Sequence, residues 1–134
     1  MISEETSSVI PEISNHSHFF FFPDLFVTRY RTPQDEAVAL AQGIADSITS
    51  DSPADVGLFV PFPFLETVQG IVGDKLIVGA EMVTPEMKGA FTGGVSPIQL
   101  KSLGIEWALA GHSERRTLNG ETDEDINAQC NVLM

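Results

Sequence analysis

The sequence has very few of the residues on which several kinds of site depend. It holds one cysteine, Cys130, which excludes an intrachain disulfide and a cysteine-based zinc cluster and is typical of a reducing compartment. Lysine and arginine together number 7 against 19 aspartates and glutamates, and the formal net charge is −12. Such an acidic surface repels nucleic acid and anionic membranes, so we expect neither as a partner. No apolar run approaches the ~20 residues that a membrane helix needs.

The composition fits a single folded domain with an atypical N-terminal segment. Hydrophobic residues make up 43% and charged residues 19% of the 134 residues. The first fifteen residues contain three glutamates and no lysine or arginine, whereas secretory signals need positive charge and transit peptides are poor in acid. We therefore expect a disordered or poorly determined tail over residues 1–18, a domain over residues 19–134 and a cytoplasmic location.

Short apolar runs alternate with helix signals along most of the chain. The runs at residues 56–60, 76–80 and 107–110 are typical of strands buried on both faces, and a less regular run ends at residues 26–27. Helices are predicted over residues 65–72, from Ser96 to residues 103–104, and from Thr122 onward. The four phenylalanines at residues 19–22 fit no such pattern, because a strand would place them on both its faces. The alternation predicts an α/β fold with parallel strands.

One further helix has a strong start signal. Thr32 is expected as its N-cap, Pro33 as its first helical residue and Asp35 as the partner in a capping box. Apolar side chains then recur at helical spacing and predict one buried face, formed by Ala37, Leu40, Ala41, Ile44, Ala45 and Ile48.

His112 is the first candidate for a functional residue. It follows the apolar run 107–110 and a glycine, at the C-terminal end of a predicted strand, where ligand sites of α/β folds gather. Ser113, Glu114 and Arg115 after it can begin a short helix, whose N-terminal amides disfavour a charge on the imidazole. Taken alone, such a histidine is more often structural than catalytic.

Two segments give the chain a resemblance to a known family. GAFTGGVSP at residues 89–97 and WALAGHSERR at residues 107–116 resemble triosephosphate isomerases, and the similarity is densest over about residues 56–129. The resemblance implies a (β/α)8 barrel, of which this chain would form an incomplete part, roughly the first four βα units with parallel strands. It also implies interconversion of dihydroxyacetone phosphate and glyceraldehyde 3-phosphate, in glycolysis and gluconeogenesis, with no metal and no organic cofactor.

The resemblance assigns roles to individual residues. His112 becomes the electrophile that polarises the substrate carbonyl, with a glutamate elsewhere in the family as the base. Ser113 begins the following helix, Glu114 pairs with an active-site lysine, and Glu121 is a supporting carboxylate that orders the site. Arg115 and Arg116 are expected to form structural ion pairs, although solvated surface charge is the alternative interpretation. The resemblance also places Thr92 and Gly93 in the loop that a partner subunit presents to the neighbouring active site.

The chain also departs from the family. Thr28 and Tyr30 stand where the family has asparagine and lysine, so the substrate-binding residues are unknown. Arg29 and Arg31 are each one residue away, which turns a strand side chain to the opposite face. Met82 stands where an asparagine is usual and Gln129 where a lysine is common. The loss of the lysine removes the principal local cation for the substrate.

These departures lead to several expectations. The family's glutamate base, lid and glycine-rich phosphate loops belong to the second half of the barrel, so we expect a fragment or mis-built product that is inactive alone. The parent enzyme would bind a triose phosphate and form a homodimer. One alternative is a non-catalytic interaction protein that docks on a full-length isomerase, and another is a half-barrel that self-assembles through its open edge strands.

Overall fold

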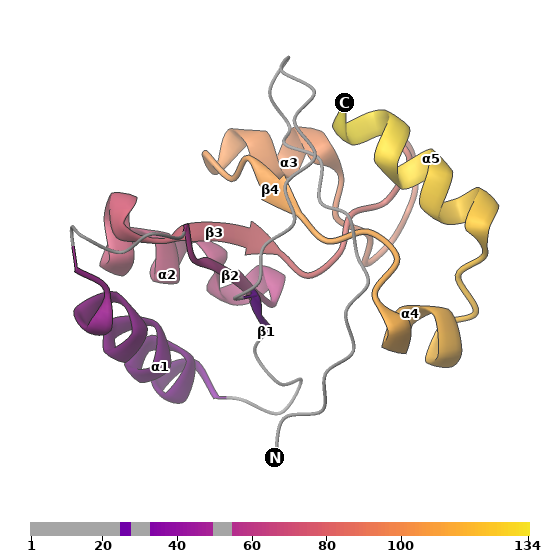
Figure 1. The fold of residues 1–134 in the computed structure, drawn as a ribbon. Helices are drawn as coiled ribbons and strands as arrows, with labels where there is room; N and C mark the ends of the chain where they lie inside the picture. The colour runs from indigo at the N-terminus through magenta and orange to yellow at the C-terminus, as the bar shows by residue number, and fades with distance from the viewer. Residues whose placement is uncertain (1–24, 28–32, 50–54) are drawn as a thin grey trace.

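The computed structural model describes residues 25–27, 33–49 and 55–134, and these form an α/β unit around one parallel sheet (Figure 1). The sheet has four strands in the order β1-β2-β3-β4, with every neighbouring pair parallel. The strands are β1 Leu25–Val27, β2 Gly57–Val60, β3 Ile77–Ala80 and β4 Trp107–Ala108. The predicted parallel α/β arrangement is confirmed for these residues.

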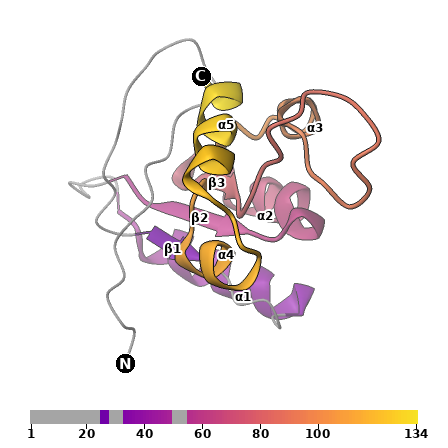
Figure 2. The ribbon, with the colours of Figure 1, turned by 90° about the vertical axis from the view of Figure 1, so that its right-hand side faces the viewer.

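Helices follow each of the strands along the chain. They are α1 Gln34–Ser47, α2 Leu65–Val72, α3 Pro97–Ser102, α4 Ser113–Leu118 and α5 Asp123–Leu133, with two short 3₁₀ turns, η1 Phe62–Phe64 and η2 Gly73–Lys75. Figure 2 shows α1 and α2 next to each other on one side of the sheet. Within the described ranges, no helix is long and apolar enough to cross a membrane.

The alternation of side chains along the strands divides the apolar residues into two clusters. Leu58 and Val60 of β2, Val78 of β3 and Ala108 of β4 pack with apolar residues of α1, α2, α3 and α5. Phe59 and Leu109 form a second cluster, against which Trp107 packs. Since successive strand residues point to opposite faces, the first cluster is the helix-covered core and the second lies on the other face of the sheet.

Helix α1 begins differently from its prediction. Its N-cap is Pro33, with extended ψ of 160° and no side-chain cap, so the predicted start with Pro33 inside the helix and a capping box to Asp35 is wrong. The helix therefore starts one residue later, at Gln34; Thr32 lies outside the described residues. Leu40 is 45% exposed, so its predicted burial is also wrong. The buried stripe is made by Ala37, Ala41 and Ala45, whose small side chains let α1 approach α2 closely.

The other predicted elements agree with the structure to within one or two residues. Helix α2 spans the predicted residues, and α3 begins with a capping box in which Ser96 and Gln99 bond reciprocally, although it ends at Ser102. Helix α5 begins with a capping box between Thr122 and Asp125. Strand β4 is only two residues long, but the Leu109 N–H still donates to the Ala80 carbonyl at 2.8 Å. The predicted tail over residues 1–18, together with Thr28 and Tyr30, lies outside the described residues.

Candidate functional site

His112 lies at the C-terminal end of β4 and is the N-cap of α4. Gly111, buried with φ of 77°, makes the turn between strand and helix, a conformation that favours glycine. A Cβ at this glycine would also lie 3.2 Å from Ile126 of α5. The half-buried imidazole accepts a hydrogen bond at Nδ1 from the Glu114 main-chain N–H, at 3.3 Å. The predicted short helix after the histidine is therefore present, and its first turn fixes the ring.

This hydrogen bond selects one form of the imidazole. A ring nitrogen that accepts a hydrogen bond from an N–H carries no proton, so the neutral ring carries its proton on Nε2. The Nε2–H of this neutral ring can then donate a hydrogen bond to a carbonyl oxygen and polarise it.

A buried carboxylate ties α4 to α5 directly beside this turn. Arg115 Nε donates to Glu121 Oε1 at 2.7 Å, and Gln129 Nε2 donates to the same oxygen at 3.1 Å. The Glu121 side chain is only 11% exposed and Gln129 is buried. The second carboxylate oxygen, Oε2, is buried and has no hydrogen-bond partner among the residues that the structure describes. The sequence analysis named Gln129 only as a replacement for lysine and did not predict its bond to Glu121. The available signal was the spacing of eight residues between the two, across the start of α5.

Arg116 forms a second, more exposed ion pair. Its Nη1 donates to Asp123 Oδ1 at 2.6 Å, with the two side chains 43% and 85% exposed, and its Nε donates to the Gly111 carbonyl at 3.3 Å. Both arginines therefore make ion pairs, as one of the two sequence interpretations expected. Neither pair involves Glu114, which is exposed and makes no ion pair within residues 33–49 and 55–134; the position expected to supply its lysine is the undescribed Tyr30.

Thr92 and Gly93 are exposed at the tip of a long loop between β3 and α3. The loop is closed at its base by the Thr84 N–H, which donates to the Val95 carbonyl at 2.8 Å, and it turns where the Gly94 N–H donates to the Phe91 carbonyl at 2.9 Å. Figure 2 shows it projecting from the body beside α3. Within the described residues, no hydrogen bond or ion pair links this tip to His112. The structure thus brings His112, Ser113, Glu114 and Glu121 into one region and leaves Thr92 and Gly93 outside it.

Two side chains of α5 have pKa values shifted from their ordinary values. The main-chain N–H and then the hydroxyl of Thr122 donate to the Asp125 carboxylate and lower its pKa from the ordinary value of 3.8. Partial burial raises the pKa of the Cys130 thiol from the ordinary value of 9.0. A raised pKa leaves less thiolate at neutral pH, which argues against Cys130 as a nucleophile.

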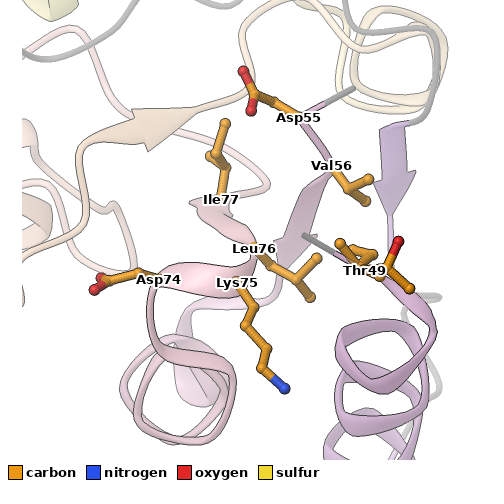
Figure 3. A pocket seen from close by; sticks show the side chains of 8 residues that line it. Thr49, Asp55, Val56, Asp74, Lys75, Leu76 and Ile77 are labelled. Atoms are coloured by element: carbon orange, nitrogen blue, oxygen red, sulfur yellow. The ribbon is translucent and has the colours of Figure 1, made fainter. Parts of the chain in front are cut away.

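A cavity of about 220 Å³ lies at the opposite ends of the strands, where β2 and β3 begin (Figure 3). Val56 and Leu76 line it, while Asp55, Asp74 and Lys75 point away from one another. It contains none of the predicted site residues. Among the described residues, no group of three histidines, cysteines or carboxylates could hold a metal ion.

Comparison with known proteins gives consistent matches. The family profile described as "Triosephosphate isomerase" matches residues 29–134. The triosephosphate isomerase of Carboxydothermus hydrogenoformans is 42% identical over 99 residues, which cover 73% of this chain and 39% of that protein. That of Cytophaga hutchinsonii is 38% identical over 102 residues, covering 75% of this chain and 41% of the relative. The chain therefore spans about two fifths of the length of these curated relatives.

Proposed function

This chain belongs to the triosephosphate isomerase family, and we propose that it forms roughly the first four βα units of the family's barrel, with His112 as the catalytic electrophile. The four parallel strands, each followed by helical structure, support the barrel assignment. The substrate proposed for the complete barrel is a triose phosphate, converted between its ketose and aldose forms without metal or organic cofactor. The single cysteine and the acidic composition agree with a cytoplasmic enzyme.

The bond from the Glu114 N–H to His112 Nδ1 is the observation that carries the assignment. In the proposed reaction, His112 Nε2–H donates to the carbonyl oxygen of the substrate while a base removes the proton from the adjacent carbon. The negative charge that develops on the enediolate oxygen then meets a fixed donor. Glu121 acts as a supporting residue by holding Arg115 and Gln129, which keeps α4 at its place against α5.

We propose that these 134 residues alone have no isomerase turnover. The electrophile needs a glutamate base and phosphate-binding loops, which the resemblance assigns to the later part of the barrel. In addition, Thr28 and Tyr30 replace the asparagine and lysine of the family, and lysine supplies a compact cation that neither replacement carries.

Activity and ring geometry test the two parts of this proposal separately. The purified 134-residue protein should show no more conversion of glyceraldehyde 3-phosphate than its His112→Gln variant, and activity above that control would overturn the claim of inactivity. Nitrogen NMR of the three histidines, with the same variant identifying the signal of His112, should show a neutral ring protonated on Nε2. A ring protonated on Nδ1 would overturn the proposed donor.

A second candidate function rests on the loop between β3 and α3. Phe91 is 50% exposed and Met87 is similarly exposed, so the loop that carries Thr92 and Gly93 presents apolar side chains to solvent. A non-catalytic protein that docks on a full-length isomerase or on its own copy would use this loop. Mixing the chain with the Carboxydothermus isomerase should then give a larger species in gel filtration, lost in Phe91→Ser and kept in Ile98→Ser, an exposed residue on α3. An unchanged elution profile would count against it.

A further inference from the structure

Gly111 gives the backbone directly before His112 unusual conformational freedom. Its φ of 77° lies in the left-handed region, and it has no side chain to restrict rotation about its own backbone bonds. The planar peptide group that joins Gly111 to His112 can therefore rotate more easily than its neighbours. Any such rotation changes the direction in which the imidazole leaves the backbone, so a fixed ring needs contacts that hold this peptide group.

Arg116 of α4 makes such a contact. Its Nε donates to the Gly111 carbonyl oxygen at 3.3 Å, and its Nη1 donates to Asp123 Oδ1 at 2.6 Å. The guanidinium is planar, so these two N–H groups point in fixed relative directions. One side chain thus connects the turn before His112 to the first residue of α5, the helix that follows α4 in Figure 1.

Helix α5 contacts the same turn with an apolar side chain. Ile126 lies three residues after Asp123, and a Cβ at Gly111 would lie 3.2 Å from two of its carbon atoms. Gly111 is buried, whereas the side chains of Arg116 and Asp123 are 43% and 85% exposed. An ion pair with this exposure adds little to stability. An effect of Arg116 on the turn can therefore be separated from an effect on folding.

We propose that Arg116 is a positioning residue for His112, because its Nε–H fixes the peptide group before the histidine and so keeps Nδ1 against the Glu114 N–H. The Glu114 nitrogen and Nδ1 are 3.3 Å apart, at the long end of hydrogen-bond distances, so a small rotation would break this bond. The inference rests on the proposed function in one respect, since His112 is the proposed electrophile and its Nε2–H needs a held ring to meet a carbonyl oxygen.

Two substitutions at position 116 separate the Nε donor from the positive charge. Arg116→Lys keeps a cation for Asp123 but places a methylene group at the position of Nε. Arg116→Gln does the reverse, since its amide nitrogen takes the position of Nε and carries no charge. The side chain is 43% exposed, so we expect both variants to fold.

Hydrogen exchange of the Glu114 amide, followed by NMR, reports on its bond to the ring. Its rate is divided by that of the Asn119 amide, which donates to the Arg115 carbonyl in the same helix, so that a general change in stability cancels. Arg116→Lys should raise this ratio several-fold and shift the nitrogen resonance of His112 Nδ1, whereas Arg116→Gln should keep both near the parent values. Parent values in the lysine variant, or a raised ratio in the glutamine variant, would overturn the proposal.

A third variant, Asp123→Asn, tests the ion pair without altering α4. It removes the charge of the partner and leaves Nε in place, so the exchange ratio should stay near that of the parent; a raised ratio would assign the ring position to the ion pair instead. The parent protein separates this inference from the proposed function. A parent ring protonated on Nδ1 would contradict the proposed donor, whereas a parent ring that accepts at Nδ1 and is unaffected by Arg116→Lys would contradict only the role of Arg116.

Discussion

Arg115 and Arg116 offer a test of burial, because they are adjacent, each binds a carboxylate at nearly the same distance, and their partners differ in exposure. The Glu121 side chain is 11% exposed in the parent protein, and Arg115→Ala removes one of its two donors among the described residues, leaving the Gln129 amide. Removing one partner of a buried pair costs about 3–5 kcal/mol, and the 29% exposure of Arg115 reduces our expectation to about 2–3 kcal/mol. Arg116→Ala breaks a pair whose carboxylate is 85% exposed, so about 0–1 kcal/mol is expected.

Urea unfolding followed by circular dichroism measures both changes. With a slope of about 1–3 kcal/mol per M, the buried pair should shift the midpoint by about 1 M and the exposed pair by a small fraction of that. Glu121→Gln added to Arg115→Ala should recover part of the loss, because it removes the unpaired buried charge. Equal shifts for the two arginine variants, or no recovery in the double variant, would show that burial of Glu121 does not govern this connection.

Three further variants probe the core, the buried carboxylate and a helix start. Gly79→Ala should lower stability by about 1–3 kcal/mol, because its Cβ would overlap the Phe59 ring; an unchanged thermal midpoint would contradict this packing. Gln129→Lys should raise stability by about 1 kcal/mol at neutral pH, because an ammonium is a charged donor for the Glu121 carboxylate, whose Oε2 has no partner among the described residues; an equal or lower urea midpoint would contradict it. Asp125→Asn should be less stable than the parent at pH 7, and the difference should shrink as the pH falls below about 4, because a carboxylate with a lowered pKa stabilises the fold only while it is ionised; a difference that stays constant as the solution is acidified would refute this.

The sequence predicted the elements whose signals are local. Ser96 and Thr122 start helices where expected because each finds its capping partner three residues later on the same chain. Thr32 and Pro33 carried a similar signal, yet the extended conformation of Pro33 moved the start of α1. Leu40 was misplaced because its burial depends on how α1 and α2 approach, which helical spacing alone does not specify.

The candidate site shows the same difference between features set by local sequence and features set by packing. The position of His112 at a strand end and the helix that follows it were predictable, because Gly111 and the first turn of α4 are contiguous with it. The bond from Gln129 to Glu121 joins residues of two different segments, and only the packing of α5 brings them together. Local patterns therefore pointed to His112 as the candidate residue, whereas the contacts that hold its helix in place required the structure.

Positively charged side chains close to His112 in the sequence are the first candidates for binding an anion beside it. Arg115 and Arg116 follow His112 after two intervening residues, but the first is paired with Glu121 and the second with Asp123. A phosphate group that recruited either arginine would leave a carboxylate without its partner, and for the buried Glu121 that loss is large. The net charge of −12 adds a long-range repulsion. Neither arginine can therefore bind an anion without giving up its carboxylate partner.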